Sequence, residues 1–304
     1  MNVLQKLLMP WQARDVLERG ATMVGGPVVR AGDALALNTP EALLRAFRLG
    51  ADRFGALPKE VVVVRFEMVP LMQTDSPTKG RKPDDPVPEV PWPSYPNGFL
   101  QAPPIVPVWL LHRTRWTRGA EVWRIDADTK QTPLTVYDGA ARGWRGVGTY
   151  RPPSPLVGPR VRWRGQEYTA DILGSTADRF ELIALGEQAP GEGFTRTRPK
   201  VWVQTVDRGD CEQIFERVIT CRWKDAEWRV VDRDAVKARL LLQDPTPQDV
   251  LRTGADEIEP GVYEATAPMD EVTDIGGFTK ELPVQKPSGT TPSPEAPSDT
   301  DPAV

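Results

Sequence analysis

The sequence predicts a mainly β protein, α+β overall, in which three-stranded antiparallel meanders repeat and pack into small barrels or a sandwich. Two observations lead to this fold class. A short hairpin-like signature occurs three times between residues 118 and 227, and each copy is followed by an Asp-bearing turn and a further strand-like run. A third observation adds a small helical N-terminal region, where an amphipathic pattern follows a helix-start signal.

Each signature consists of a basic residue, two turn-forming positions and a Glu. The copies occupy residues 118–121, 164–167 and 224–227. Two-residue hairpin loops favour Gly, Asn or Asp because their turns need positive φ. With the central pair as the loop, the basic residue faces the Glu across the hairpin, where opposite charges contribute about 1 kcal/mol or less.

Aromatic residues flank the second and third copies. In the predicted register Trp163 lies opposite Tyr168, and Trp223 lies opposite Trp228. Large rings in direct cross-strand pairs fix the register of a hairpin. These two copies therefore predict closely similar hairpins.

The first copy departs from this pattern. Trp116 and Trp123 are one residue further from the loop than the aromatic pairs of the other two copies. Strand alternation therefore places them on the sheet face opposite to that of those pairs. The first hairpin is therefore degenerate or uses a different loop. The copies are also about 46 and 60 residues apart, which is too irregular for a propeller or solenoid.

The second copy, VGPRVRWRGQEYTADIL, resembles the first hairpin of SH3-like or Tudor-like barrels. The resemblance covers less than a tenth of the chain, and no binding residue is carried over from it. It implies that the meanders form SH3-like barrels, with a sandwich as the other arrangement.

Helix and strand signals precede the repeats. Asn38 or Thr39 caps a predicted helix that has Pro40 in its first turn and an apolar stripe after it. The β-branched run 61–66 predicts a buried strand. Near the other end, a short capped helix is predicted to begin at Thr246 or Pro247 and to end at Leu251.

Composition changes along the chain predict four regions. Residues 1–72 form an N-terminal α/β region, and residues 73–107 a proline-rich strap or linker. Residues 108–275 form a β domain with three related hairpin units. Residues 282–304 are rich in Pro, Ser and Thr with little apolar content, which predicts a disordered tail.

The proline-rich segment also carries aromatic residues, among them Trp92 and Tyr95. Repeated X-Pro steps exclude helix and favour extended backbone. The segment is either an ordered strap that seats its rings on the fold or a ligand for a proline-recognising partner. The aromatic residues favour the strap.

Charge and hydropathy limit the partners. The 304 residues carry a formal charge of −4 with a pI near 5.4, which disfavours general nucleic-acid or acidic-membrane binding. No apolar run reaches the length of a transmembrane helix. The first residues lack the pattern of a secretory signal, so we expect a cytoplasmic or particle-associated protein, a virion included.

Signals for chemistry are weak. The single histidine, His112, has no nucleophile motif beside it and reads as a strand residue. The D-x-D pairs Asp126/Asp128 and Asp232/Asp234 are typical of turns more than of a cation site. No phosphate-binding, dinucleotide-binding or zinc motif occurs, so no catalytic residue, metal or cofactor is predicted.

Two further short features have simple interpretations. Cys211 and Cys221 provide no metal framework, and two buried thiols are favoured over a bond between them. The Arg-Gly-Asp string at 208–210 is interpreted as a turn.

Aromatic residues are the main functional lead. Ten tryptophans occur, most in the β region, where core packing is favoured over exposed platforms for the majority. The candidate binding residues are Trp116, Trp123, Trp163, Tyr168, Trp223, Trp228, Trp92 and Tyr95.

The favoured function is a non-enzymatic protein–protein interaction or assembly component, such as a bacteriophage or bacterial particle protein or an adaptor. One alternative is an enzyme with an Asp/Glu/Arg site at β turns. The other is a single-strand nucleic-acid binder that uses an Arg/Trp-rich sheet. The sequence favours a non-enzymatic protein over an enzyme. It predicts neither the partner nor the oligomeric state.

Overall fold

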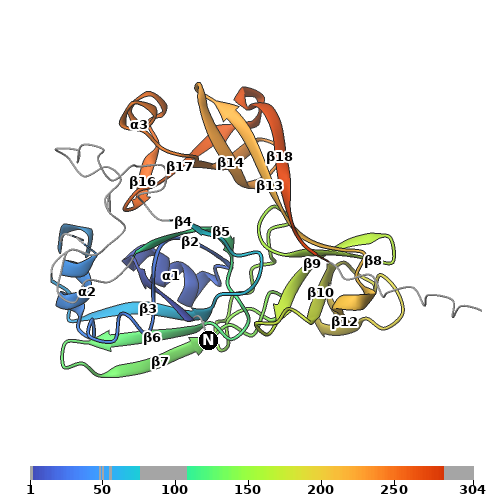
Figure 1. The fold of residues 1–304 in the computed structure, drawn as a ribbon, viewed down its shortest axis with the longest axis horizontal. Coiled ribbons are helices and arrows are strands. Elements are labelled where there is room, and N and C mark those ends of the chain that lie inside the picture. Colours follow the sequence, from blue (N-terminus) through green and yellow to red (C-terminus); the bar gives the residue numbers. More distant parts are fainter. Residues whose placement is uncertain (1–2, 48, 50, 55–56, 76–107, 284–304) are drawn as a thin grey trace, which may run out of the picture.

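The computed structural model describes residues 3–47, 49, 51–54, 57–75 and 108–283. The fold is mainly β: two large antiparallel sheets of seven and eleven strands with a few short helices (Figure 1). Within this described part neither sheet closes into a barrel, so the expected closed SH3-like barrels are not found. Most of the proline-rich segment (76–107, with Trp92 and Tyr95) and of the tail (284–304) lies outside the described residues.

The first sheet has the strand order β4-β5-β2-β1-β3-β6-β7. Its strands are β1 (Val3–Leu8), β2 (Met23–Arg30), β3 (Glu60–Glu67), β4 (Thr74–Asp75), β5 (Trp109–Arg115), β6 (Glu121–Asp126) and β7 (Gln131–Val136). The predicted strand at 61–66 is confirmed as β3. Successive side chains of β1 point to opposite faces of the sheet and belong to two apolar cores. Leu4 and Leu8 belong to the same core as Val16, and Leu7 to the same core as Leu43.

Two helices cover this sheet. Helix α1 (Pro10–Arg19) starts with a proline and ends at Gly20 in the left-handed conformation. Helix α2 (Pro40–Ala46) begins as predicted, because the Ala42 N–H donates to Thr39 Oγ1 at 3.1 Å. A short 3-10 turn, η1 (Ala51–Phe54), follows α2.

The second sheet is built from two halves with the same strand order. Along it the strands run β11-β12-β10-β9-β8-β13-β14-β15-β17-β16, and β18 pairs with β13. Their bounds are β8 (Arg160–Trp163), β9 (Gln166–Leu173), β10 (Arg179–Leu185), β11 (Thr195–Arg198), β12 (Val201–Asp207), β13 (Gln213–Trp223), β14 (Ala226–Arg233), β15 (Lys237–Leu242), β16 (Asp256–Glu259), β17 (Val262–Pro268) and β18 (Thr273–Leu282).

We call β8–β12 the first unit and β13–β17 the second unit. In each unit a three-strand meander is followed by a hairpin whose second strand joins the meander. A 3-10 turn then leads to a strand that returns to the first strand of the unit: η2 (Arg208–Asp210) leads to β13, and η3 (Met269–Glu271) leads to β18. Helix α3 (Pro247–Thr253) lies in the second unit and is capped by Thr246. It begins at one of the two predicted positions and ends two residues later than predicted.

The prediction that the first signature is a hairpin is wrong. Strand β5 pairs with β2 and β4, whereas β6 pairs with β3 and β7, so three central strands separate them. Strands β1, β2 and β3 take the middle of the sheet, and residues 116–120 join β5 to β6. Trp116 and Trp123 are therefore not a cross-strand pair, and β5, β6 and β7 complete the first sheet.

The second and third signatures are hairpins, but each loop begins one residue earlier than predicted. Trp163 lies opposite Gln166, and Trp223 lies opposite Ala226. The loops are Arg164-Gly165 and Lys224-Asp225, all with positive φ, as a type I′ turn requires.

This register changes the pairs without changing the faces. Trp163 contacts Tyr168 diagonally with ring centroids 6.4 Å apart, and Trp223 contacts Trp228 at 5.6 Å. In both hairpins the first loop residue stacks its cation on the preceding tryptophan, at 4.1 Å for the first unit and 4.4 Å for the second.

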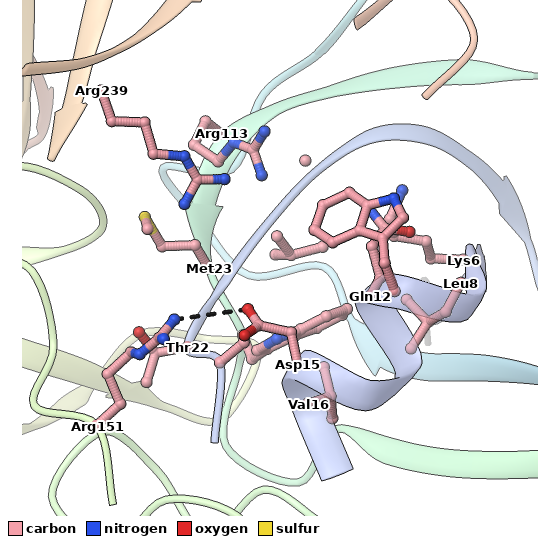
Figure 2. A pocket seen from close by; sticks show the side chains of 15 residues that line it. Lys6, Leu8, Gln12, Asp15, Val16, Thr22, Met23, Arg113, Arg151 and Arg239 are labelled. Carbon is pink, nitrogen blue, oxygen red and sulfur yellow. Dashed lines mark hydrogen bonds and ion pairs between the residues drawn. The ribbon is translucent and has the colours of Figure 1, made fainter. Parts of the chain in front are cut away.

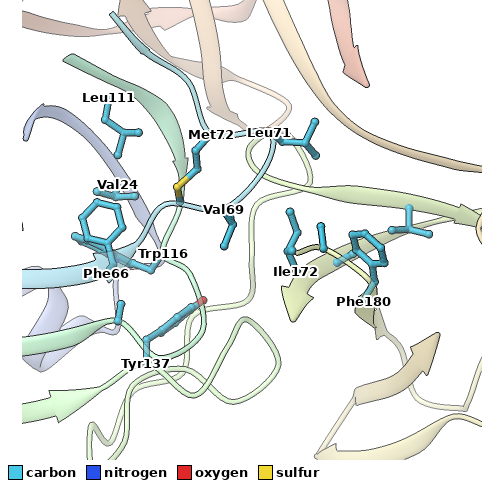
Figure 3. Close-up of a cluster of buried hydrophobic side chains, with 14 of the residues drawn as sticks. Val24, Phe66, Val69, Leu71, Met72, Leu111, Trp116, Tyr137, Ile172 and Phe180 are labelled. Atoms are coloured by element: carbon cyan, nitrogen blue, oxygen red, sulfur yellow. The ribbon is translucent and has the colours of Figure 1, made fainter. Parts of the chain in front are cut away.

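One apolar core runs from the first sheet into the first unit (Figure 3). Phe66, Trp116 and Tyr137 lie at one end, Ile172 and Phe180 at the other, and the segment after β3 lies between them. A separate core fills the second unit. No helix of the described residues is long and apolar enough to cross a membrane.

Candidate functional site

The first sheet meets the second unit through a buried polar layer. Lys6 of β1 forms an ion pair with Glu259 of β16, and both side chains are at most 3% exposed. Gln12 of α1 donates to the other oxygen of Glu259 at 2.6 Å. Burial lowers the pKa of Lys6, an effect that Glu259 opposes. Glu259 fits closely because Gly26, with φ +82°, has no side chain: a Cβ there would lie 3.0 Å from a Glu259 oxygen.

Two more carboxylates hold arginines beside this contact. Glu264 of β17 accepts from Arg113 of β5 at 2.5 Å and from Arg239 of β15 at 2.6 Å. Glu216 of β13 accepts from Arg229 of β14 at 3.0 Å, with both side chains at most 3% exposed. These ion pairs form the floor between β5 and the second unit.

An open cleft of about 420 Å³ lies above this floor. Its described lining residues are Gly26, Asp75, Leu110, Leu111, His112, Arg113, Arg229, Leu241, Leu242, Gln243, Asp244, Pro245, Gly261 and Val262. The cleft volume and its mixture of leucines with a few polar groups are typical of small-ligand sites. We take this cleft as the candidate functional site.

The only histidine lies in this cleft. His112 Nε2 is 2.6 Å from Asp75 Oδ2, and both side chains are about one-third exposed. An Asp–His pair can orient a proton-transfer group. However, none of the described residues that line the cleft is Ser, Thr or Cys, so they supply no hydroxyl or thiol nucleophile there.

A smaller pocket lies beside the cleft, with Arg113 shared between them (Figure 2). Its volume is about 40 Å³, which is room for a few water molecules. Figure 2 shows Lys6, Arg113, Arg151 and Arg239 around it, with the Arg151 guanidinium 3.5 Å from the Asp15 carboxylate.

The sequence-predicted site residues do not gather at either cavity. Trp163, Tyr168, Trp223 and Trp228 are buried in the two units, and Trp123 on β6 is half-buried. Trp116 is also buried and lines the small pocket. The expectation that most tryptophans are core residues is thus confirmed.

The arginines interleaved with these rings are engaged. Arg118 and Arg142 reach Glu181, and Arg160 and Arg162 reach Glu167. Arg115 donates to the carbonyl oxygens of Val157, Pro159 and Ala170. These five arginines are therefore held within the fold, whereas Arg164 and Arg179 line an open cavity together with Trp163.

The weaker signals are placed as well. Asp128 and Asp234 accept from backbone N–H groups in their turns, as expected of turn residues. The described residues contain no group of three or more His, Cys, Asp or Glu that could hold a metal. Cys211 and Cys221 are free and buried, and burial raises the pKa of each to about 11.

A second surface feature is strand β18. Among the described strands it pairs with β13 alone, so one of its edges is free. Ile275 and Phe278 are 50% and 56% exposed on it. Gly277 allows β18 to approach β13 closely, because a Cβ at position 277 would lie 2.1 Å from the Val218 carbonyl oxygen.

Sequence reasoning missed both the cleft and the free edge. Nothing local in the sequence brings Asp75 to His112 or Arg113 to Glu264, which are separated by 37 and 151 residues. The alternation of β18 is interrupted by two glycines, which hides it as a strand.

No protein-family model, no curated protein and no solved structure matches the chain.

Proposed function

We propose that the protein is a non-enzymatic interaction or assembly component that binds a partner protein along the free edge of β18. The observation that carries the proposal is a ten-residue strand with a free edge and two exposed apolar side chains, Ile275 and Phe278. A free edge offers unpaired N–H and C=O groups to an added strand. Soluble proteins usually protect such an edge with charge or proline, and the centre of β18 has neither.

The charge of this edge defines the partner segment. Asp270, Glu271, Asp274 and Glu281 are exposed along residues 270–282, and the only basic residue there, Lys280, is buried. A complementary segment is extended, apolar at alternate positions and basic at its ends. The acidic residues along 270–282 of a second copy would repel those of the first. The partner is therefore a different protein. A particle component and an adaptor are two forms of this role, both compatible with a cytoplasmic or particle-associated location.

Two matched variants test this proposal. Ile275→Lys and Phe278→Lys each place a charge on β18. The control, Val236→Lys, changes an apolar residue outside β18 that is 67% exposed. Wild-type and variant proteins are used to capture partners from cells that produce the protein, and a photo-crosslinker at position 278 maps the contact. We expect the two β18 variants to lose a stoichiometric partner that wild type and V236K retain. Equal recovery by all four proteins contradicts the proposal.

We further propose that the two units arose by duplication of one open, SH3-like unit. Support comes from their common strand order, from the equivalent 3-10 turns η2 and η3, and from the matched hairpins at Trp163 and Trp223. A reciprocal exchange of the second loop residues, Gly165→Asp and Asp225→Gly, tests the equivalence of these hairpins.

A further inference from the structure

The floor of the cleft has more buried cations than carboxylates. Arg113 and Arg229 line the cleft and pair with Glu264 and Glu216. Lys280, opposite Glu216 in the β13–β18 ladder, is the third cation. All five residues are at most 9% exposed. Three buried cations therefore meet two buried carboxylates, and Arg239 adds further positive charge to Glu264. The partly exposed Asp75, which pairs with His112, also acts on Lys280.

The same three cations have unsatisfied donors. Among the described residues, Arg113 Nε, Arg229 Nε and Lys280 Nζ have no hydrogen-bond partner. Burial of an unpaired charged donor is costly, so a buried cation usually has a counter-charge. Burial lowers the pKa of Lys280 and of Arg229, and Glu216 opposes the shift in both.

Apolar residues line the cleft on both sides. Leu110 and Leu111 of β5 form one wall, and Leu241, Leu242 and Val262 form the other. A cleft with a cationic floor and apolar walls complements a molecule that is acidic at one end and apolar along its body.

We propose that this cleft binds a ligand with a single carboxylate on an apolar body. The carboxylate lies against Arg113 and Arg229 and supplies the missing negative charge, with Lys280 behind them. The apolar body lies between the leucine walls, near the His112–Asp75 pair. A free aliphatic acid and the C-terminal carboxylate of a peptide share this chemistry.

Calorimetry with paired probes tests the ligand class. Octanoate is compared with 1-octanol, and the tripeptide Ala-Leu-Leu is compared with its C-terminal amide. We expect an acid to bind at least about tenfold more tightly than its neutral counterpart, because a charge-assisted hydrogen bond contributes more than one tenfold step. Tighter binding of octanoate or of the peptide acid identifies the source. Equal affinity of acid and neutral forms, or no binding of either acid, overturns the proposal.

Two variants locate the site. Lys280→Met removes a cation that has no hydrogen-bond partner in the described part of the chain, so it leaves no acceptor orphaned. Lys130→Met removes an exposed lysine before β7 and is the control. We expect K280M to weaken binding of the acid about tenfold or more, with K130M unchanged. Equal affinities for the two variants overturn the assignment.

A wall variant gives a second measurement. Leu241→Glu puts a carboxylate on a half-buried wall position and is expected to abolish binding of the acid. Retained affinity in a folded L241E protein contradicts the proposal. Ile275→Lys and Phe278→Lys are expected to leave this affinity unchanged, so failure at the β18 edge and failure at the cleft are distinguishable.

Discussion

Asp171 is a buried carboxylate with a specific hydrogen-bond donor, and it illustrates the consequence of burial for stability. This side chain is 5% exposed in β9, and its Oδ2 accepts from the Ala140 N–H at 2.6 Å. Burial is the main effect on its pKa and raises it, while Arg115 and the Ala140 N–H oppose the rise. The folded protein therefore holds this proton more tightly than the unfolded chain does.

The sign of the pH dependence follows from that difference. The contribution of protonated Asp171 to stability is fully present below the ordinary Asp pKa and is lost as pH rises through the folded-state pKa. Asp171→Asn keeps an acceptor for Ala140 and removes the ionisation. We expect the free energy of unfolding of D171N, relative to wild type, to increase from acid to neutral pH in urea titrations.

Asp234 provides a control of opposite sign. Its carboxylate accepts from the Val236 and Lys237 N–H groups, which lower its pKa, so it stabilises the fold above the ordinary Asp pKa. D234N should lose stability relative to wild type as pH rises. A D171N difference that does not change with pH, or that changes in the same direction as D234N, contradicts the assignment for Asp171.

At the scale of elements, the two hairpins provide a reciprocal exchange. The second loop position is Gly165 in one hairpin and Asp225 in the other, with φ of 74° and 53°. A non-glycine residue in this region costs about 1 kcal/mol. We expect Gly165→Asp to destabilise and Asp225→Gly to stabilise the protein by about that amount in denaturant unfolding. Effects of the same sign at both positions contradict the type I′ assignment.

The sequence predicted the elements better than their partners. The caps at Thr39 and Thr246 are local signals, and both helices begin where these signals place them. The loop was predicted one residue too late, because both registers keep Trp163 and Tyr168 on one face. The registers differ in the cross-strand pairs and in which residues take positive φ. Arg164 takes it and stacks on Trp163, which turn statistics that favour Gly at that position do not anticipate.

At the scale of the whole molecule, the sequence carries no signal for how the parts join. Lys6 and Glu259 are 253 residues apart, and Gln12 and Glu259 are 247 apart. A lysine within the apolar strand β1 is unusual, yet its partner lies on a strand that reads as ordinary polar sequence. The cleft also depends on residues that are far apart in the sequence. Its two walls come from different sheets, and only the folded chain brings them together.

The Lys6–Glu259 pair permits a test of this junction. Lys6→Met leaves a buried carboxylate without its cation, and we expect a loss of about 3–5 kcal/mol in the free energy of unfolding. The double variant Lys6→Met/Glu259→Met removes both charges and should recover most of that loss, since paired buried charges pay a desolvation cost that apolar side chains do not. Arg53→Met is the matched control at the same junction: its pair with Glu257 is about one-third exposed and should contribute less than about 1 kcal/mol. If K6M costs no more than R53M in chemical denaturation, the buried pair does not hold the first sheet to the second unit.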